Sequence, residues 1–315
     1  MTRVDGLHHI TAISGEAART HAFYSRVLGQ RLVKKTVNFD DPGTYHLYYG
    51  DERGLAGSVM TFFPFAHARP GVVGAGQVSL THYAVPVGSL GFWEARLEAA
   101  GAPLIAREAV FGEERLVSQD PDGLLLALVE AEGDTRPGWT TEEIGAEQAI
   151  RGFHGATLAL NQGAAETEAL LTGPLGYSRV EEVPLGKGRL VRFAAGDRAG
   201  VVDLHIDPSM GFGLEGAGSV HHIAFSVPDR AAQEAVRAAV AATGQPVTQR
   251  IDRQYFHAIY FRTPSGVLFE VATEEPGFDV DEPVEALGAA LKLPPQHEPL
   301  RDRIEAVLPS LEDAA

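Results

Sequence analysis

The sequence predicts an α+β fold built from four βαβββ modules, and three observations support this prediction. Four short segments typical of β-strands each carry a histidine, and these histidines, His9, His82, His154 and His222, are 73, 72 and 68 residues apart. A stretch typical of a helix follows each segment, and three further strand candidates follow each helix. A repeat of this length indicates one supersecondary unit that occurs four times.

The elements of each module are visible in the side-chain pattern. Helix candidates carry apolar residues at three- and four-residue spacing, as around Phe23 and Val27. Each helix is expected to stop at the glycine best placed for a left-handed cap, namely Gly29, Gly101, Gly176 and Gly244. Strand candidates are rich in Val, Leu, Tyr and Phe and are separated by Gly, Pro and Asp. The clearest are residues 45–49, 58–62, 190–193, 258–262 and 267–272.

These elements divide the chain into two halves and a tail. The N-terminal half, 1–135, holds modules at about 4–65 and 78–132. The C-terminal half, 151–275, holds modules at about 151–208 and 218–275. Residues 136–150 are polar, contain Pro and Gly, and are expected to be the linker. Residues 276–315 form a tail in which a short helix is expected at 300–308.

Composition excludes several classes of protein. The chain of 315 residues has 26 Lys and Arg against 42 Asp and Glu, and its net charge of -16 would repel nucleic acid and anionic membranes. It has no cysteine, which excludes disulfides, thiolate metal sites and cysteine nucleophiles. The first twenty residues lack the apolar core of a signal peptide, and the longest apolar run, 124–129, is too short for a membrane span. We therefore expect a cytoplasmic protein with no nucleic-acid or membrane partner.

Six phrases add a family resemblance to the modular pattern. They are GLHHITAISG (6–15), YHLYYGD (45–51), GSVMTFFPF (57–65), RGFHGATLAL (151–160), VHHIAFSVPD (220–229) and YFRTPSGVLFEVAT (260–273). The four units resemble the vicinal oxygen chelate superfamily, and the phrases resemble its ring-cleaving dioxygenases that act on hydroquinones. The resemblance covers residues 4 to about 275. It implies paired modules whose mixed sheets curl into two open β-barrels with the helices outside.

Alternation along the strands places the candidate ligands. When the repeats are aligned, His9, His82, His154 and His222 share one inward-facing position. Alignment of the last strands on their glycines then puts the following residues at one position: Thr61, Ala127, Leu204 and Glu270. Only the fourth unit is therefore expected to offer a ligand there.

Glu270 lies in an apolar strand, where an unpaired ionised carboxylate is costly to bury and a metal ion would remove the cost. Glu270, His222 and one histidine from a partner unit would make the two-histidine, one-carboxylate set of non-haem Fe(II) oxygenases. The resemblance takes the third ligand from the first unit, as His9, and so implies that units one and four share the pocket while units two and three pair. Fe(II) with O2 as co-substrate is the expectation, although such a triad also accepts Mn(II).

Further site candidates come with structural alternatives. The resemblance places Tyr260 and Arg253 in the pocket, where a hydroxyl and a fixed cation would hold a substrate oxygen. His8 and His221 should face away by strict alternation, yet the resemblance associates them with the pocket. Thr11 shares a face with His9 and is a candidate to position substrate, and His257 is another titratable group near the site. The acid–base residue stays open, with His205 the nearest upstream candidate.

The sequence therefore predicts a non-haem Fe(II) extradiol-type dioxygenase that opens a hydroquinone- or catechol-type aromatic diol beside a hydroxyl. One alternative is a glyoxalase-type isomerase or lyase, which would use a carboxylate from each contributing unit. The other is an aromatic- or drug-binding protein without catalysis. The expected partner is a small aromatic diol, and the sequence leaves a homo-oligomer open.

Overall fold

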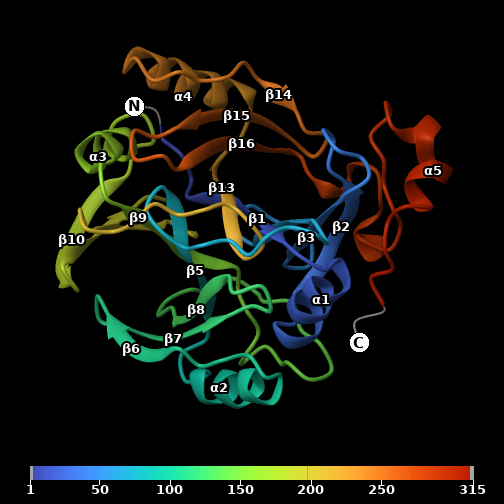
Figure 1. The fold of residues 1–315 in the computed structure, drawn as a ribbon, viewed down its shortest axis with the longest axis horizontal. Helices are drawn as coiled ribbons and strands as arrows, with labels where there is room; N and C mark the ends of the chain where they lie inside the picture. Colours follow the sequence, from blue (N-terminus) through green and yellow to red (C-terminus); the bar gives the residue numbers. More distant parts are fainter. Residues whose placement is uncertain (1–2, 197, 313–315) are drawn as a thin grey trace.

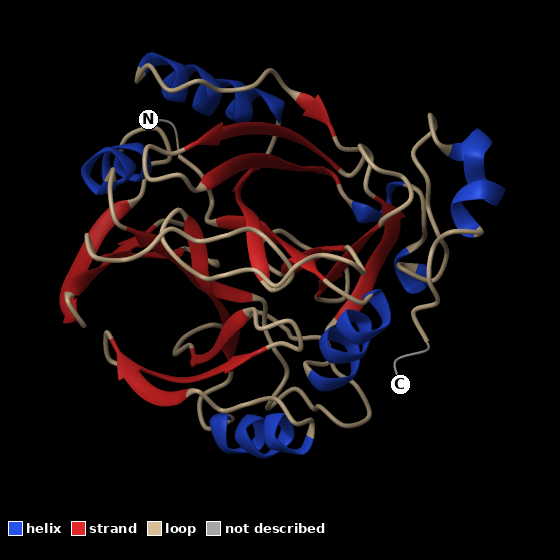
Figure 2. Ribbon diagram, viewed as in Figure 1, coloured by secondary structure: helices blue, strands red, loops and turns tan. Residues whose placement is uncertain are grey.

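Two eight-stranded mixed sheets, each curled into a half-barrel, dominate the structure. The structure is a computed structural model that describes residues 3–196 and 198–312. One sheet has the strand order β14-β15-β16-β13-β1-β4-β3-β2 and the other β10-β11-β12-β9-β5-β8-β7-β6. Figure 1 shows the two sheets side by side, and Figure 2 shows the helices mostly on their outer surfaces. The prediction of an α+β fold of four βαβββ modules is confirmed.

Each module contributes one strand, one helix and then three strands. Unit one has β1 (Leu7–Ser14), α1 (Ala17–His21) continued by the π-helix η1 (Ala22–Val27), β2 (Arg31–Val37), β3 (Tyr45–Gly50) and β4 (Val59–Pro64). Unit two has β5 (Gln77–Val85), α2 (Leu90–Ala99), β6 (Ala106–Val110), β7 (Glu113–Gln119) and β8 (Leu125–Glu130). Unit three has β9 (Phe153–Leu160), α3 (Ala164–Thr172), β10 (Ser178–Leu185), β11 (Gly188–Ala194) and β12 (Val201–Ile206). Unit four has β13 (Ser219–Val227), α4 (Arg230–Ala242), β14 (Ile251–Asp252), β15 (Phe256–Arg262) and β16 (Leu268–Pro276).

The first strands of the modules join the sheets. Strand β1 pairs antiparallel with β13, and β5 pairs antiparallel with β9. Units one and four therefore form one barrel and units two and three the other, the pairing that the family resemblance implies. The barrel of units one and four thus combines the two ends of the repeat region.

A glycine follows the end of three module helices as expected, whereas α3 ends at Thr172 with Gly173, not Gly176, as its cap residue. The four glycines at which helices were predicted to stop all have positive φ, with values of 66°, 70°, 73° and 84° in chain order. Such a conformation is unstrained in glycine because it lacks a Cβ. At its other end α4 is capped by Asp229, whose carboxylate accepts hydrogen bonds from the amides of Ala231 and Ala232.

The C-terminal tail packs against the outside of unit one. Its helix α5 (Arg301–Glu305) is shorter than the expected 300–308, because a 3-10 turn, η4 (Glu298–Leu300), precedes it and the chain leaves the helix after Glu305. Two further 3-10 turns are η2 (Phe278–Val280) and η3 (Val284–Ala286). Lys34 on β2 is fully buried beneath the tail and pairs with Asp281, at 2.6 Å, and with Glu282. Within the described ranges, the helices are all too short or too polar to cross a membrane.

Candidate metal centre

Three side chains from three strands converge inside the barrel of units one and four. They are His9 on β1, His222 on β13 and Glu270 on β16, and all three are buried. The Nε2 atoms of the histidines lie 3.3 Å apart, and a Glu270 oxygen, Oε2, lies 3.4 Å from His9 Nε2 and 3.0 Å from His222 Nε2. The structure thus brings together the three residues predicted as metal ligands.

The backbone explains why two adjacent histidines in each strand approach the site. The pairing of β1 with β13 shifts register between Leu7 and His9, and again opposite His221, so that His8 and His221 each occupy a bulge. A bulge breaks the strict alternation of side chains. His221 accordingly lines the cavity instead of facing away as alternation alone predicted, while His8 is buried against His9 and Phe256.

The bulged histidines orient the candidate ligands. Nδ1 of His8 lies 2.9 Å from Nδ1 of His9, and Nδ1 of His221 lies 2.7 Å from Nδ1 of His222. Burial, together with the neighbouring imidazole, lowers the pKa of His8 to about 3 and the pKa of His221 to about 4. Both are therefore neutral at pH 7, and His8 also bonds the backbone of Thr273. A neutral Nδ1 acceptor holds the proton of each candidate ligand on Nδ1, which leaves Nε2 free to bind a metal.

Glu270 supplies the test of whether a cation fits here. Its side chain is 0% exposed, yet neither carboxylate oxygen has a hydrogen-bond partner among the described residues. Burial opposes ionisation, but the adjacent histidines outweigh it and hold the pKa of the Glu270 carboxyl well below its usual range. A buried carboxylate with two imidazole nitrogens beside its Oε2 is a donor set that fits a divalent cation.

A cavity of about 500 Å³ opens onto the triad. Aromatic side chains form much of its wall, namely Phe39, Phe63, Phe65, Phe256, Tyr48 and Tyr260. Arg253 also lines it and donates from Nε to the Tyr260 hydroxyl over 3.3 Å. Arg253 is anchored on its other side by Asp40, 3.6 Å away in the loop after β2. Tyr260 and Arg253 are therefore placed in the cavity that the sequence resemblance assigned to them.

Other sequence candidates lie elsewhere. Thr11 is fully buried and bonds Thr61 over 2.8 Å between hydroxyls, and it does not line the cavity. His257 is also absent from the cavity wall, although its strand carries Tyr260. His205 lies on β12 in the other barrel and cannot reach the triad. Sequence reasoning missed His46, which does line the cavity and lies two residues before Tyr48 on the same face of β3.

Strand pairing in the barrel of units two and three, the second barrel, shows that the predicted alignment of the last strands was wrong at one position. Tyr260 pairs with Glu270 across β15 and β16, and the corresponding pair across β11 and β12 is Arg192 with Asp203. Asp203, not Leu204, therefore occupies the position of Glu270 in unit three. The prediction that this unit offers no carboxylate is wrong, because the turn before β12 differs by one residue and defeats an alignment on glycines.

The histidine alignment also fails in this barrel. Thr11 pairs with His222 in the first barrel, and the matching pair in the second is His82 with Gly155. Gly155 therefore corresponds to His222, and a Cβ there would overlap the carbonyl oxygen of Val201. His154 sits in the bulge that corresponds to His221. By the same comparison Leu80 corresponds to His9. The second barrel therefore has no histidine at either ligand position.

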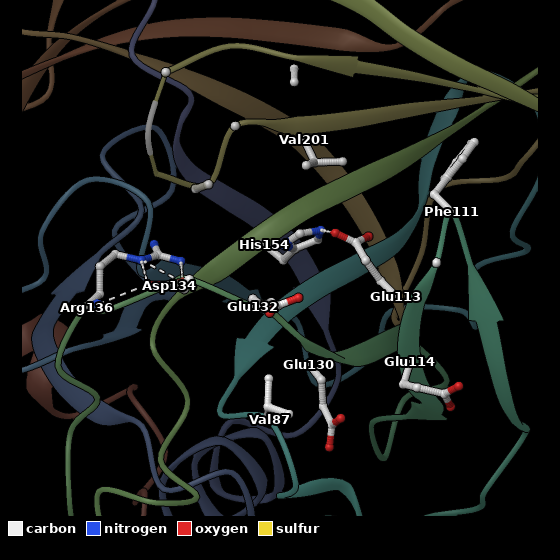
Figure 3. A pocket seen from close by; sticks show the side chains of 17 residues that line it. Val87, Phe111, Glu113, Glu114, Glu130, Glu132, Asp134, Arg136, His154 and Val201 are labelled. Carbon is white, nitrogen blue, oxygen red and sulfur yellow. Dashed lines mark hydrogen bonds and ion pairs between the residues drawn. The ribbon is translucent and has the colours of Figure 1, made fainter.

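In the second barrel the guanidinium of Arg192 neutralises the buried carboxylate of Asp203. Its guanidinium bonds both oxygens of the fully buried Asp203, over 2.9 and 3.0 Å, and also contacts Glu113. Figure 3 shows Glu113 extending toward His154, whose Nε2 lies 3.1 Å from the carboxylate. A cavity of about 810 Å³ on this side of the molecule is lined by Glu113 and His154 and is the larger of the two, but neither Arg192 nor Asp203 lines it. Among the described residues, the corresponding carboxylate in the barrel of units one and four, Glu270, has no arginine or lysine paired with it.

The sequence and the fold match one superfamily of known proteins. The chain belongs to the Glyoxalase/Bleomycin resistance protein/Dioxygenase superfamily, whose family model matches residues 6–128 and 143–271. Glyoxalase I from Zea mays has a related fold, with a TM-score of 0.63 and 16% identity over 85% of this chain and 92% of that one.

Closer relatives carry dioxygenase names. MhqO of Bacillus subtilis (strain 168), named among the ring-cleaving dioxygenases, is 48% identical over 95% of this chain and 94% of its own. The chlorohydroquinone/hydroquinone 1,2-dioxygenase of Sphingobium indicum is 37% identical over 96% of this chain and 95% of its own. A solved Bacillus subtilis structure described as a dioxygenase superposes with a TM-score of 0.94 and 46% identity over 99% of both chains.

Proposed function

We propose that this chain is an Fe(II)-dependent dioxygenase that opens the ring of a hydroquinone-type aromatic diol beside a hydroxyl. One observation carries the proposal: a buried carboxylate without a hydrogen-bond partner meets two imidazole nitrogens at the base of an aromatic-walled cavity. The names of the close relatives support the same reaction class.

His9, His222 and Glu270 would hold the metal, and a bound Fe(II) would supply the redox chemistry of dioxygen and lower the pKa of a coordinated hydroxyl. The cavity's aromatic side chains would orient the ring and exclude water. The Tyr260 hydroxyl accepts from Arg253, and with Glu270 bound to the metal its own proton would be available to a substrate oxygen. The fixed charge of Arg253 would stabilise negative charge on that oxygen.

The isomerase alternative is less well supported. It would require a carboxylate or similar ligand from unit one at the position of Thr61. The Thr61 hydroxyl is instead 2.8 Å from both Thr11 Oγ1 and His46 Nε2, so it is engaged within the barrel wall. A binding protein without metal would have no use for an unpaired buried carboxylate. We therefore favour the oxygenase.

The test is oxygen uptake by protein reconstituted anaerobically with Fe(II), with hydroquinone, chlorohydroquinone and catechol as substrates. We expect one O2 consumed per ring-opened product, and loss of both iron and uptake in Glu270→Gln. Glu166→Gln, an exposed change on α3, is the matched control and should retain both. Thiol-dependent turnover of methylglyoxal without O2 uptake would establish the isomerase, and full iron and activity in Glu270→Gln would refute the ligand assignment.

A further inference from the structure

The cavity has a second tyrosine that matches Tyr260 on the opposite wall. Tyr48 pairs with Thr61 across β3 and β4, just as Tyr260 pairs with Glu270 across β15 and β16. Both tyrosines line the cavity, and the hydroxyl of each lies against a nitrogen-bearing side chain. The partner of Tyr260 is Arg253, whereas the Tyr48 hydroxyl lies 2.8 Å from Nδ1 of His46.

A chain of hydrogen bonds fixes the polarity of the Tyr48 hydroxyl. His46 Nε2 lies 2.8 Å from the Thr61 hydroxyl, which in turn lies 2.8 Å from the Thr11 hydroxyl. Burial keeps His46 neutral by lowering its pKa well below its usual range. A neutral imidazole has one N–H, and a phenol is a stronger acid than a neutral imidazole. Tyr48 therefore donates to Nδ1, and Nε2–H donates to Thr61.

The ring of His46 is also held in place by packing. Its centroid lies 4.1 Å from the ring of Tyr48 and 4.2 Å from the ring of Phe63. With both nitrogens engaged in hydrogen bonds, His46 offers no free polar group to a ligand. Its effect on the cavity must pass through Tyr48.

The two walls consequently differ in what they offer a ligand. Tyr260 accepts from the Arg253 cation and has Glu270 as a second neighbour, so with Glu270 on a metal its proton would be free to donate to an ionised oxygen. Tyr48 has its proton committed to His46 and keeps lone pairs free, which suits an oxygen that still carries hydrogen. We propose that Tyr48 binds the second, protonated hydroxyl of an aromatic diol and that His46 is the positioning residue that makes Tyr48 an acceptor. This inference rests on the proposed function and extends it to substrate selection.

The experiment compares two ligands that differ at that hydroxyl. Anaerobic calorimetry on the metal-loaded protein would measure the binding of hydroquinone and of 4-methoxyphenol, which cannot donate from its second oxygen. Loss of one neutral hydrogen bond in Tyr48→Phe should weaken hydroquinone binding about tenfold and change 4-methoxyphenol binding by less than about twofold. Tyr49→Phe is the matched control, because this hydroxyl lies on the next residue and contacts His21 instead, 3.2 Å away.

Variants at His46 test the positioning role independently. His46→Ala releases the Tyr48 proton and should remove most of the preference for hydroquinone. His46→Gln restores an acceptor and a donor at matching places and should recover it. Thermal unfolding would identify any variant that is not folded. If Tyr48→Phe does not fold, the comparison of His46→Ala with His46→Gln still tests the inference.

The outcomes separate the inference from the function on which it rests. Failure of the wild-type protein to bind either phenol would defeat the proposed function. Tight wild-type binding of hydroquinone with equal losses for both ligands in Tyr48→Phe, or with none, would overturn the inference alone. Equal effects of the alanine and glutamine variants at His46 would overturn its positioning role.

Discussion

Replacement of Arg192 by methionine tests whether the second barrel is purely structural. The change removes the guanidinium that bonds both oxygens of Asp203, whose side chain is 0% exposed. Glu113, whose side chain is 28% exposed, can recover water, but Asp203 cannot. Loss of one partner from a buried ion pair costs about 3–5 kcal/mol, because the other charge stays buried. In a chain of this size the loss corresponds to a fall in Tm of about 6–10 °C.

The assay is urea unfolding of the metal-free protein, with metal content measured in parallel. The double variant Arg192→Met with Asp203→Leu removes both charges and should recover at least about 2 kcal/mol of the free energy of unfolding. Metal binding should be unchanged in both variants, since the triad lies in the other barrel. A loss below about 1 kcal/mol in Arg192→Met, or a loss of bound metal, would refute the assignment of this ion pair as a structural substitute for a cation.

Three further predictions concern stability, tautomer and the tail. Burial raises the pKa of the Asp120 carboxyl to about 6, so its ionisation lowers the free energy of unfolding as pH rises from 4 to 7. Over that range the stability of Asp120→Asn relative to wild type should rise by up to about 3 kcal/mol. Equal pH dependence of urea unfolding in the two proteins would contradict this. His8→Ala leaves the Nδ1 proton of His9 without its acceptor and should weaken metal binding about 10- to 100-fold in chelator competition, whereas wild-type affinity would exclude an orienting role. Lys34→Met leaves Asp281 and Glu282 without their cation and should lower the free energy of urea unfolding by about 3–5 kcal/mol. Lys35→Met, at a half-buried neighbour, is the control and should lower it by under about 1 kcal/mol. Equal losses in the two variants would show that the buried ion pairs do not stabilise the tail.

The fold and the converging triad could be predicted because both are periodic features. The module repeat, the glycine helix ends and the inward position of Glu270 follow from local rules of helix and strand. The partner of unit four could not be derived in this way. Strand pairing between distant modules depends on the whole sheet, and only the family resemblance pointed to His9.

Bulges and turns account for the errors. Alternation assumes a regular strand, but the bulges at His8 and His221 change which way these side chains point. The alignment that selected Leu204 over Asp203 assumed equal turns before each last strand. A buried carboxylate beside a conspicuous inward arginine was the available signal, since Arg192 and Asp203 alternate with apolar residues on their strands.

The two barrels present one electrostatic problem and two solutions. Each places a carboxylate at the same point of its last strand, with no exposure to water. In the second barrel Arg192 bonds both oxygens of Asp203 and so neutralises that charge. In the first barrel Tyr260 stands at the position of Arg192, and it cannot neutralise an anion. The protein therefore provides no fixed cation for Glu270, and a metal ion could bind there. The first barrel has His9 and His222 where the second barrel has Leu80 and Gly155. That difference, rather than cavity size, makes the smaller cavity the candidate for chemistry.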